Sequence, residues 1–214
     1  MIDRRHFIKT HTRLLPVPFV PEIQLYLADE ATELWQKTED ELGKIGLPPP
    51  FWAFAWAGGQ ALARYILDHP ALVACQTVLD FASGSGLVAI AAKMAGAAQV
   101  MACDIDEFAG VAMQENARAN HVTLEPRIAD LIGTDQGWDM VFAGDVSYER
   151  DMAENVTTWL HKLHQRGAKV LIGDPERTYL ARAHLEKIAQ YQVPVPRTLE
   201  DMDVKASSVW AFQG

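Results

Sequence analysis

Cysteine is scarce in this sequence, which has only Cys75 and Cys103 among its 214 residues. The two cysteines are far apart and form no C-x-x-C pair, which argues against a disulfide framework and a zinc site and fits a reducing compartment. The N-terminal stretch MIDRRHFIKTHTR is basic but lacks the apolar core of a secretory signal. We therefore expect a cytoplasmic protein, or a mitochondrial matrix protein if the chain is a processed eukaryotic one.

Cationic side chains are also in short supply, with 19 Lys and Arg against 28 Asp and Glu and a net charge of -9. A protein that binds a nucleic-acid backbone needs clustered cations, so this task is disfavoured. No apolar run reaches the ~18 residues that span a bilayer, so no membrane partner is expected. These absences leave a globular protein, expected to be a monomer, whose acidic balance suits a basic partner or a lysine side chain.

The chain length suits one compact domain with an appended N-terminal segment. A mostly helical stretch is predicted from about Glu22 to Gly43, between two groups of prolines that stop helices. Residues 1–50 are therefore interpreted as a helical lid or brace, and residues 51–214 as the main domain. A short helix is predicted at Gly58–Asp68.

From Thr77 onward, short apolar runs alternate with amphipathic helical patterns, which indicates βαβ units and a parallel sheet. Strands are predicted at 77–82, 99–103, 126–129, 138–143 and 168–172. Helices are predicted at 86–95, 107–119, 150–165 and 178–190, with Gly96 and Gly167 placed to end two of them in a left-handed conformation. Two last strands, 194–198 and 207–213, are expected to pair antiparallel at the sheet edge. This α/β pattern resembles the Rossmann-like, seven-stranded class I methyltransferase fold.

The stretch LDFASGSGLVA (79–89) is typical of a strand, a glycine turn and a helix start that together bind a nucleotide-like ligand. Gly84-x-Gly86-x-x-Ala89 fits a dinucleotide fingerprint, and Asp104 follows Gly84 by 104 − 84 = 20 positions, the spacing of an acid that binds a ribose. An NAD-dependent dehydrogenase and a non-catalytic nucleotide-binding module are therefore alternatives.

Two features favour S-adenosylmethionine as the ligand. Asp80 lies near the carboxyl end of its strand, where it suits an ammonium group, whereas a pyrophosphate would be repelled by a few kcal/mol at an effective dielectric near 20. Ala82 also stands where a dinucleotide fold has its first glycine. Asp130 and Leu131, after the third strand, are candidates for an adenine-edge acceptor and an apolar floor. In the alternative interpretation, Asp80 caps the turn and Asp104 caps the next helix.

Six segments together resemble one family closely. They are WAFAWAGGQALARYILDHP (52–70), LDFASGSG (79–86), CDID (103–106), WDMVFAGDVSY (138–148), VLIGDP (170–175) and SSVWAFQ (207–213). They are similar to the lysine methyltransferases that act on the beta subunit of electron transfer flavoprotein. That family belongs to a seven-strand group marked by Asp-x-x-Tyr or Asp-x-x-Phe after the fourth strand, here Asp145 to Tyr148. The chain departs from the pattern at Ala82, where a glycine is customary.

The resemblance implies S-adenosylmethionine as methyl donor, S-adenosylhomocysteine as product and a lysine of that subunit as acceptor; another protein or a small molecule is the alternative acceptor. It implies that Asp145 and Tyr148 face the acceptor. Trp56 would pack on the cofactor, Asp80 would face its ammonium group and Asp104 would hold its ribose. The full implied cofactor site is Trp56, Gly59, Asp80, Ala82, Ser83, Gly84, Ser85, Gly86, Asp104, Ile105, Asp130 and Leu131.

Methyl transfer to a lysine requires alignment and an unprotonated nitrogen rather than a covalent nucleophile. A free lysine has a pKa of about 10.4, so removing its proton at pH 7 costs roughly 4–5 kcal/mol. A nearby carboxylate favours the ammonium form, so Asp145 is expected to bind and orient the lysine rather than deprotonate it. Tyr148 is expected to direct the nitrogen. The alternatives are a helix cap for Asp145 and core aromatic roles for Tyr148 and Trp56.

Metal and hydrolase chemistry have weaker signals in the sequence. His161 and His164 lie three apart in one predicted helix but lack acids at ligand spacing, so they are interpreted as a solvated face. No metal is expected. Ser83 and Ser85 do not form the G-x-S-x-G pattern of a hydrolase elbow.

Overall fold

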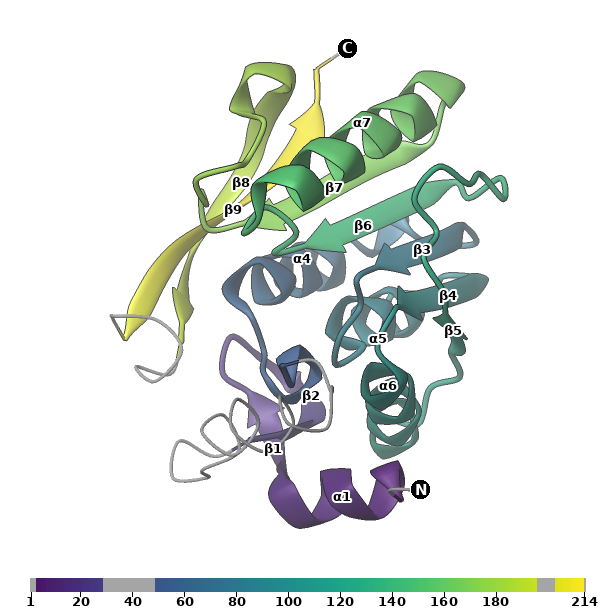
Figure 1. The fold of residues 1–214 in the computed structure, drawn as a ribbon, viewed down its shortest axis with the longest axis vertical. Helices are drawn as coiled ribbons and strands as arrows, with labels where there is room; N and C mark the ends of the chain where they lie inside the picture. The colour runs from purple at the N-terminus through teal and green to yellow at the C-terminus, as the bar shows by residue number, and fades with distance from the viewer. Residues whose placement is uncertain (1–2, 29–48, 196–202, 214) are drawn as a thin grey trace.

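A computed structural model describes residues 3–28, 49–195 and 203–213, and a seven-stranded sheet runs through it with helices on both faces (Figure 1). The strands are β3 (Thr77–Phe81), β4 (Gln99–Asp104), β5 (Glu125–Ile128), β6 (Met140–Gly144), β7 (Lys169–Asp174), β8 (Leu185–Pro194) and β9 (Val204–Phe212). Their order is β5-β4-β3-β6-β7-β9-β8. Neighbours from β5 to β7 are parallel, and β9 is antiparallel to both β7 and β8. The predicted α/β class and its antiparallel edge are confirmed.

Helices sandwich the central strands, which explains why these strands are mostly apolar. The helices α4 (Ala57–Asp68), α5 (Leu87–Met94) and α6 (Glu107–Ala119) cover one face, and α7 (Arg150–Arg166) covers the other (Figure 1). Along β3, Val78 belongs to the first apolar cluster and Leu79 to the second. Because both faces are buried, the parallel strands show continuous apolar runs rather than alternation.

The predicted ends of α4, α5, α6 and α7 agree with the structure to within one residue. α4 begins one residue before the helix predicted at Gly58–Asp68 and ends at the same residue. Gly96 follows the end of α5 with φ of 94°, and Gly167 ends α7 with φ of 108°. Both values are left-handed, the conformation that glycine adopts without a steric cost.

The helix predicted at 178–190 is wrong. Residues Leu185–Pro194 form the strand β8, preceded only by a short 3-10 turn at Arg182–His184. The segment LEKIAQ is rich in good helix formers, and pairing with β9 overrides this local preference. A register shift between Lys187 and Ala189 keeps Tyr191 and Val193 on the covered side of the strand. The edge hairpin therefore starts earlier than the predicted strand at 194–198, and residues 196–202 lie outside the described part.

The N-terminal region also departs from the prediction. It contains α1 (Arg4–His11) and an antiparallel hairpin of β1 (Arg13–Val17) and β2 (Val20–Leu27). The helix predicted from Glu22 is therefore wrong up to Leu27, where Ile23, Leu25 and Leu27 are buried with a period of two. The rest of that predicted helix, from residue 29 to Gly43, lies outside the described residues.

Contacts with α6 hold the N-terminal elements against the main sheet. The backbone N–H groups of Gln24 and Tyr26 donate to the side-chain oxygens of Asn120 and Asn116, at 2.9 and 2.8 Å. Glu115 on α6, only 4% exposed, forms ion pairs with Arg5 and Lys9 of α1. These contacts fit a brace, and the domain division at residue 50 stays a prediction.

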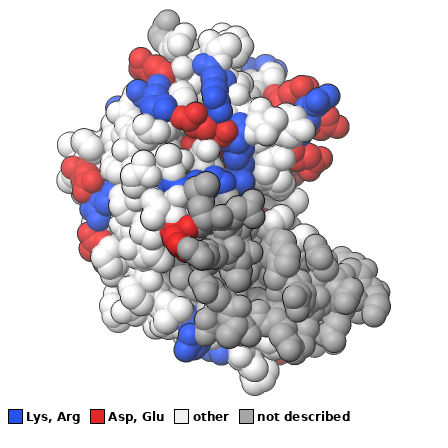
Figure 2. Space-filling view, turned by 90° about the vertical axis from the view of Figure 1, so that its left-hand side faces the viewer, with Lys and Arg blue, Asp and Glu red and all other residues white. Residues whose placement is uncertain are grey.

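The described surface mixes charges of both signs. Figure 2 shows Lys and Arg beside Asp and Glu on the visible described part of that face. Within the described part of the chain, no helix has the length and apolar character to cross a membrane.

Candidate active site

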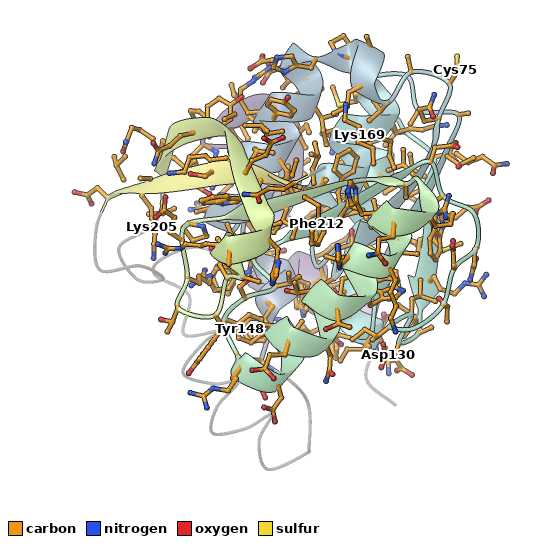
Figure 3. The ribbon with its side chains drawn as sticks, turned by 90° about the horizontal axis from the view of Figure 1, so that it is seen from above. Cys75, Asp130, Tyr148, Lys169, Lys205 and Phe212 are labelled. Carbon is orange, nitrogen blue, oxygen red and sulfur yellow. The ribbon has the colours of Figure 1, made fainter. Side chains whose placement is uncertain are left out.

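A cavity of about 520 Å³ opens at the carboxyl ends of β3, β4 and β6. This is the edge of a parallel sheet at which ligands bind. Figure 3 shows Asp130 and Tyr148 on this side of the molecule, and Cys75, which precedes β3, at the opposite side. All but two of the predicted cofactor residues line the cavity: Trp56, Gly59, Asp80, Ala82, Ser83, Gly84, Ser85, Asp104, Ile105 and Asp130.

The two exceptions are Gly86 and Leu131, and the structure gives each a different place. Gly86 is the N-cap of α5 with φ of 84°, and a Cβ there would lie 3.4 Å from Met113. Leu131 is only 5% exposed and belongs to the apolar cluster beneath α7, whereas its neighbour Ile132 lines the cavity. The apolar floor predicted at Leu131 stays a prediction, and Ile132 is the neighbouring apolar residue that lines the cavity.

The glycine turn is held in place by left-handed backbone and by Asp104. Ala82 has φ of 52°, as does Gly84, so the chain reverses sharply after β3. The N–H of Gly84 donates to Asp104 Oδ2 at 2.9 Å, and the N–H of Asp106 donates to Asp104 Oδ1 at 3.0 Å. Asp106, not Asp104, caps α6 through Phe108 N. Burial raises the pKa of Asp104, which lies beside the exposed side chain of Ile105 at the cavity.

Asp80 is buried beneath the turn, with 1% exposure. Its Oδ2 accepts hydrogen bonds from the Ser83 hydroxyl and from the N–H of Ala89 at 3.0 Å. The capping alternative is therefore present in the structure, but a carboxylate accepts up to about four hydrogen bonds and Asp80 also lines the cavity. Burial raises its pKa to about 7, which an adjacent cation would lower again.

Asp145 sits on the other side of the cavity at the end of β6. Its φ of 56° is left-handed, and its backbone N–H donates to Gly173 O at 2.9 Å. Its Oδ2 accepts from Gly59 N at 2.9 Å, at the N-terminus of α4. Its Oδ1 lies 3.1 Å from the guanidinium of Arg177. These bonds do not involve α7, so the helix-cap alternative is not supported.

The pKa of Asp145 reflects opposing influences. Burial raises it to about 6, while the positive charge of Arg177 and the Gly59 hydrogen bond lower it and nearby Asp174 raises it. The carboxyl group is therefore mostly ionised at neutral pH.

Close packing of glycines brings α4 to Asp145. A Cβ on Gly58 would lie 2.2 Å from the carbonyl oxygen of Gly173 on β7, so no larger residue fits without moving the backbone. A Cβ on Gly144 would lie 3.2 Å from Gly59. The consecutive glycines after Trp56 therefore allow the first turn of α4 to reach the carboxylate.

Aromatic rings surround the mouth of the cavity. The Phe51 ring lies 5.9 Å from that of Trp56 and 5.8 Å from that of Tyr148, and Phe54 is 5.9 Å from Trp56. The Trp56 indole N–H donates to Phe51 O at 2.9 Å. Tyr148 is 48% exposed, so it is not a core residue, and burial of its hydroxyl raises its pKa. Trp56 also lines the cavity rather than the core.

Sequence reasoning missed Arg177, the cation that pairs with Asp145. It lies three residues after the carboxyl end of β7, and the same rule that identified Asp145 at the end of β6 would have pointed to it. His161 and His164 stack on the ring of Phe212, at 5.3 and 5.5 Å. Among the described residues, no group of three His, Cys, Asp or Glu side chains is placed to hold a metal ion.

Comparisons with known proteins point to methyltransferases. Residues 61–144 match the family model of ribosomal protein L11 methyltransferase (PrmA). The chain is 38% identical over 216 residues to the electron transfer flavoprotein beta subunit lysine methyltransferase of Xenopus laevis, with 98% of this chain and 87% of that protein covered. It is 39% identical over 200 residues to the protein of that name from Homo sapiens, with 90% and 75% covered.

Two solved structures share the fold. A ribosomal protein L11 methylase from Lactobacillus delbrueckii has a TM-score of 0.52 at 21% identity, covering 73% of this chain and 79% of that one. Magnesium protoporphyrin IX methyltransferase from Synechocystis, solved with S-adenosylhomocysteine bound, has a TM-score of 0.53 at 15% identity, covering 73% and 81%. At these identities the likeness concerns the fold alone.

Proposed function

The chain belongs to the electron transfer flavoprotein beta subunit lysine methyltransferase family, and we propose on that basis that it methylates lysine side chains of this subunit. It is an S-adenosylmethionine-dependent methyltransferase with a class I fold. The dehydrogenase alternative loses its support, since the similar proteins reported above are methyltransferases. Another protein or a small molecule stays the alternative acceptor.

The cavity fits a methionine-derived nucleoside, which supplies an electrophilic methyl group when bound. Ala82, Ser83, Gly84 and Ser85 line the cavity, and Asp80 offers a buried carboxylate that suits an ammonium group. Asp104 keeps unused lone pairs for ribose hydroxyls, and Ile105, 76% exposed, offers an apolar face to the base. We propose that these residues, with Trp56 and Asp130, hold the cofactor.

The observation that carries the acceptor assignment is the position of Asp145. It is a carboxylate, mostly ionised at neutral pH, on the wall of a largely apolar cavity that the glycine turn and the exposed ring of Tyr148 also line. A lysine side chain that enters between the aromatic rings meets the carboxylate at the end of its path. Asp145 then orients the nitrogen, and Tyr148 and Phe51 shield it from water.

Radiolabelled methyl transfer tests the proposed function. The purified chain is incubated with labelled S-adenosylmethionine and the purified beta subunit from the same organism, and a parallel reaction contains a whole-cell extract. We expect label in the beta subunit and methyl-lysine in its mass spectrum. Label in other proteins or in small molecules, with an unlabelled beta subunit, would reject this acceptor.

A further inference from the structure

Arg177 occupies a position that the function proposed above does not yet use. It follows β7 in the stretch Asp174–Arg177, and its backbone N–H donates to Asp174 Oδ1 at 2.6 Å. Its guanidinium lies 3.1 Å from Asp145 Oδ1, and its central carbon is 6.0 Å from the centroid of the Trp56 ring. The side chain is 21% exposed and that of Asp145 is 10% exposed, so water screens the pair only weakly.

The charges that face Asp145 come from three elements. The N-terminus of α4 contributes the Gly59 N–H, and the loop after β7 contributes Arg177 and the buried carboxyl group of Asp174. Tyr148 and Glu149 follow Asp145 in the same loop. Burial and the charges of Glu149 and Asp104 raise the pKa of Tyr148, whereas the charge of Arg177 lowers it. Arg177 is the cation among these groups, and it touches the carboxylate directly.

A lone carboxylate beside a substrate lysine would oppose the reaction. The attraction between the carboxylate and the ammonium group would hold the proton on the lysine nitrogen. Only the neutral amine has the lone pair that forms a bond to the methyl carbon. The site must therefore orient the nitrogen without stabilising its protonated form.

We propose, resting on the lysine methylation proposed above, that Arg177 is a positioning residue which neutralises Asp145, so that this carboxylate accepts a hydrogen bond from a neutral lysine amine. Asp145 has the capacity for this bond, because Gly59 and Arg177 each use one of its roughly four acceptor positions. The guanidinium keeps its charge at all accessible pH values, which a lysine in its place would not guarantee.

The transfer step balances with these assignments. The lysine ammonium first releases a proton to solvent, which the nearby positive charges favour. The nitrogen lone pair then forms the C–N bond while the C–S bond breaks with its electron pair left on sulfur. The product is a methylated ammonium and a neutral thioether, and the ammonium can lose its second proton to solvent.

Single-turnover methyl transfer across pH 6.5–10 tests this role with Arg177→Met and Arg177→Lys. We expect R177M to lose roughly 10- to 100-fold in the transfer rate at pH 7, with the apparent pKa of its rising limb about 1–2 units higher. The rate should approach that of the wild-type enzyme within about threefold at pH 10. R177K should keep the wild-type profile to within about half a unit.

A binding measurement separates this role from a structural one. With S-adenosylhomocysteine bound, R177M should bind the substrate protein at pH 7 as tightly as the wild type or more tightly, because the unneutralised Asp145 attracts the ammonium. Its affinity for S-adenosylhomocysteine should stay within about twofold. Arg182→Met is the matched control, because Arg182 is an exposed arginine nearby that pairs with Glu176 instead, and it should leave the profile unchanged.

Two results would overturn the role of Arg177 alone. One is an R177M rate that falls equally at every pH, with R177K equally impaired, which would make the residue a brace for its loop. The other is weaker substrate binding by R177M, which would make it a direct contact for the substrate. Failure of the wild-type enzyme to methylate any lysine is a different result, and it would reject the proposed function instead.

Discussion

At the residue scale, Asp145 is the residue proposed to face the methyl acceptor, and both of its carboxylate oxygens have hydrogen-bond partners. Its two oxygens already accept from Gly59 and Arg177, and their remaining acceptor positions are what a lysine amine would use. Asp145→Asn keeps the shape and removes the charge. We expect methyl transfer to fall at least about 100-fold, while the affinity for S-adenosylhomocysteine changes by less than about threefold. Calorimetry measures the affinity for S-adenosylhomocysteine, and labelled transfer measures the rate. An equally large loss of affinity would show that Asp145 binds the cofactor rather than the methyl acceptor.

Ala82 carries backbone strain in the cofactor turn. Its φ of 52° is a conformation that costs an L-residue roughly 1–2 kcal/mol, and the family resemblance placed a glycine there. Ala82→Gly should therefore raise the free energy of unfolding by about 0.5–1 kcal/mol, after the larger unfolded-state entropy of glycine is subtracted. Urea denaturation measures the change. Ala91→Gly in the interior of α5 is the control and should have the opposite sign; a destabilised A82G would show that the strain is relieved elsewhere.

At the element scale, the contact between α4 and the sheet depends on glycines that leave no room for a Cβ, and Gly58 is one of them. Gly58→Ala would place that atom 2.2 Å from Gly173 O and 2.6 Å from Asp145 Oδ2, so α4 must move away. We expect a loss of about 3 kcal/mol or more in unfolding free energy, or failure to fold. The adjacent Gly59→Ala meets only Leu87 and Val88 at 3.9 and 4.0 Å. It should fold with stability within about 1 kcal/mol of wild type but bind S-adenosylhomocysteine more weakly. Equal stability of both variants would contradict this packing.

Elements with a regular apolar pattern in the sequence, or with a glycine at their end, were predictable. β3, β6 and β7 are continuous apolar runs, and both α5 and α7 end at glycines that adopt positive φ. β8 was not predictable in this way, because its stability depends on pairing with β9 rather than on its own helix-favouring residues. β2 does carry a sequence signal, the period of two of Ile23, Leu25 and Leu27, which the helix predicted from Glu22 overlooked. Its bonds to Asn116 on α6 and to Asn120, the C-cap of that helix, join residues far apart in the chain.

The same limit applies to the site. Asp80, Asp104 and Asp145 stand at the ends of recognisable strands, and all three line the cavity. Which of two consecutive residues lines the cavity, as with Leu131 and Ile132, depends on a loop conformation that no periodic pattern encodes. Arg177 lies on such a loop as well. Its partnership with Asp145 joins residues 32 positions apart, and only the parallel arrangement of β6 and β7 brings them together.

At the scale of the whole molecule, the buried acids of the cavity make the free energy of unfolding depend on pH. The folded-state pKa of Asp80 is raised to about 7 and that of Asp145 to about 6, from 3.8. A raised carboxyl pKa means that the folded state binds more protons than the unfolded state between those values. Their stabilising contribution is therefore complete below about pH 4 and is lost as the pH rises through 6 and 7. For Asp80 the loss is about 4 kcal/mol at 1.36 kcal/mol per unit.

The unliganded protein should accordingly lose stability between about pH 5 and pH 7. The carboxyl groups of Glu22, Asp135, Asp139 and Glu176 have lowered pKa values, and their contribution is already complete above about pH 5, so they do not reverse this trend. Urea unfolding at several pH values measures this loss of stability. Asp80→Asn removes the larger titration and should flatten the dependence, because its side-chain oxygen can still accept from Ser83 and Ala89. An unchanged slope in D80N would contradict the assignment.

Cofactor binding should respond to the same titration with the opposite sign. If the ammonium group of S-adenosylhomocysteine lies beside Asp80, binding lowers the pKa of that carboxyl group and releases its proton. Affinity then increases between pH 5.5 and pH 8, by about 10-fold when the shift is one unit or more, and thermal stabilisation by a fixed ligand concentration increases with it. Calorimetry in buffers of different ionisation enthalpy detects the released proton directly. Because D80N has no proton to release, its affinity should be lower at pH 8 and nearly independent of pH. An equal pH dependence in the wild type and D80N would place the ammonium group elsewhere in the cavity and leave Asp80 as a cap for the turn.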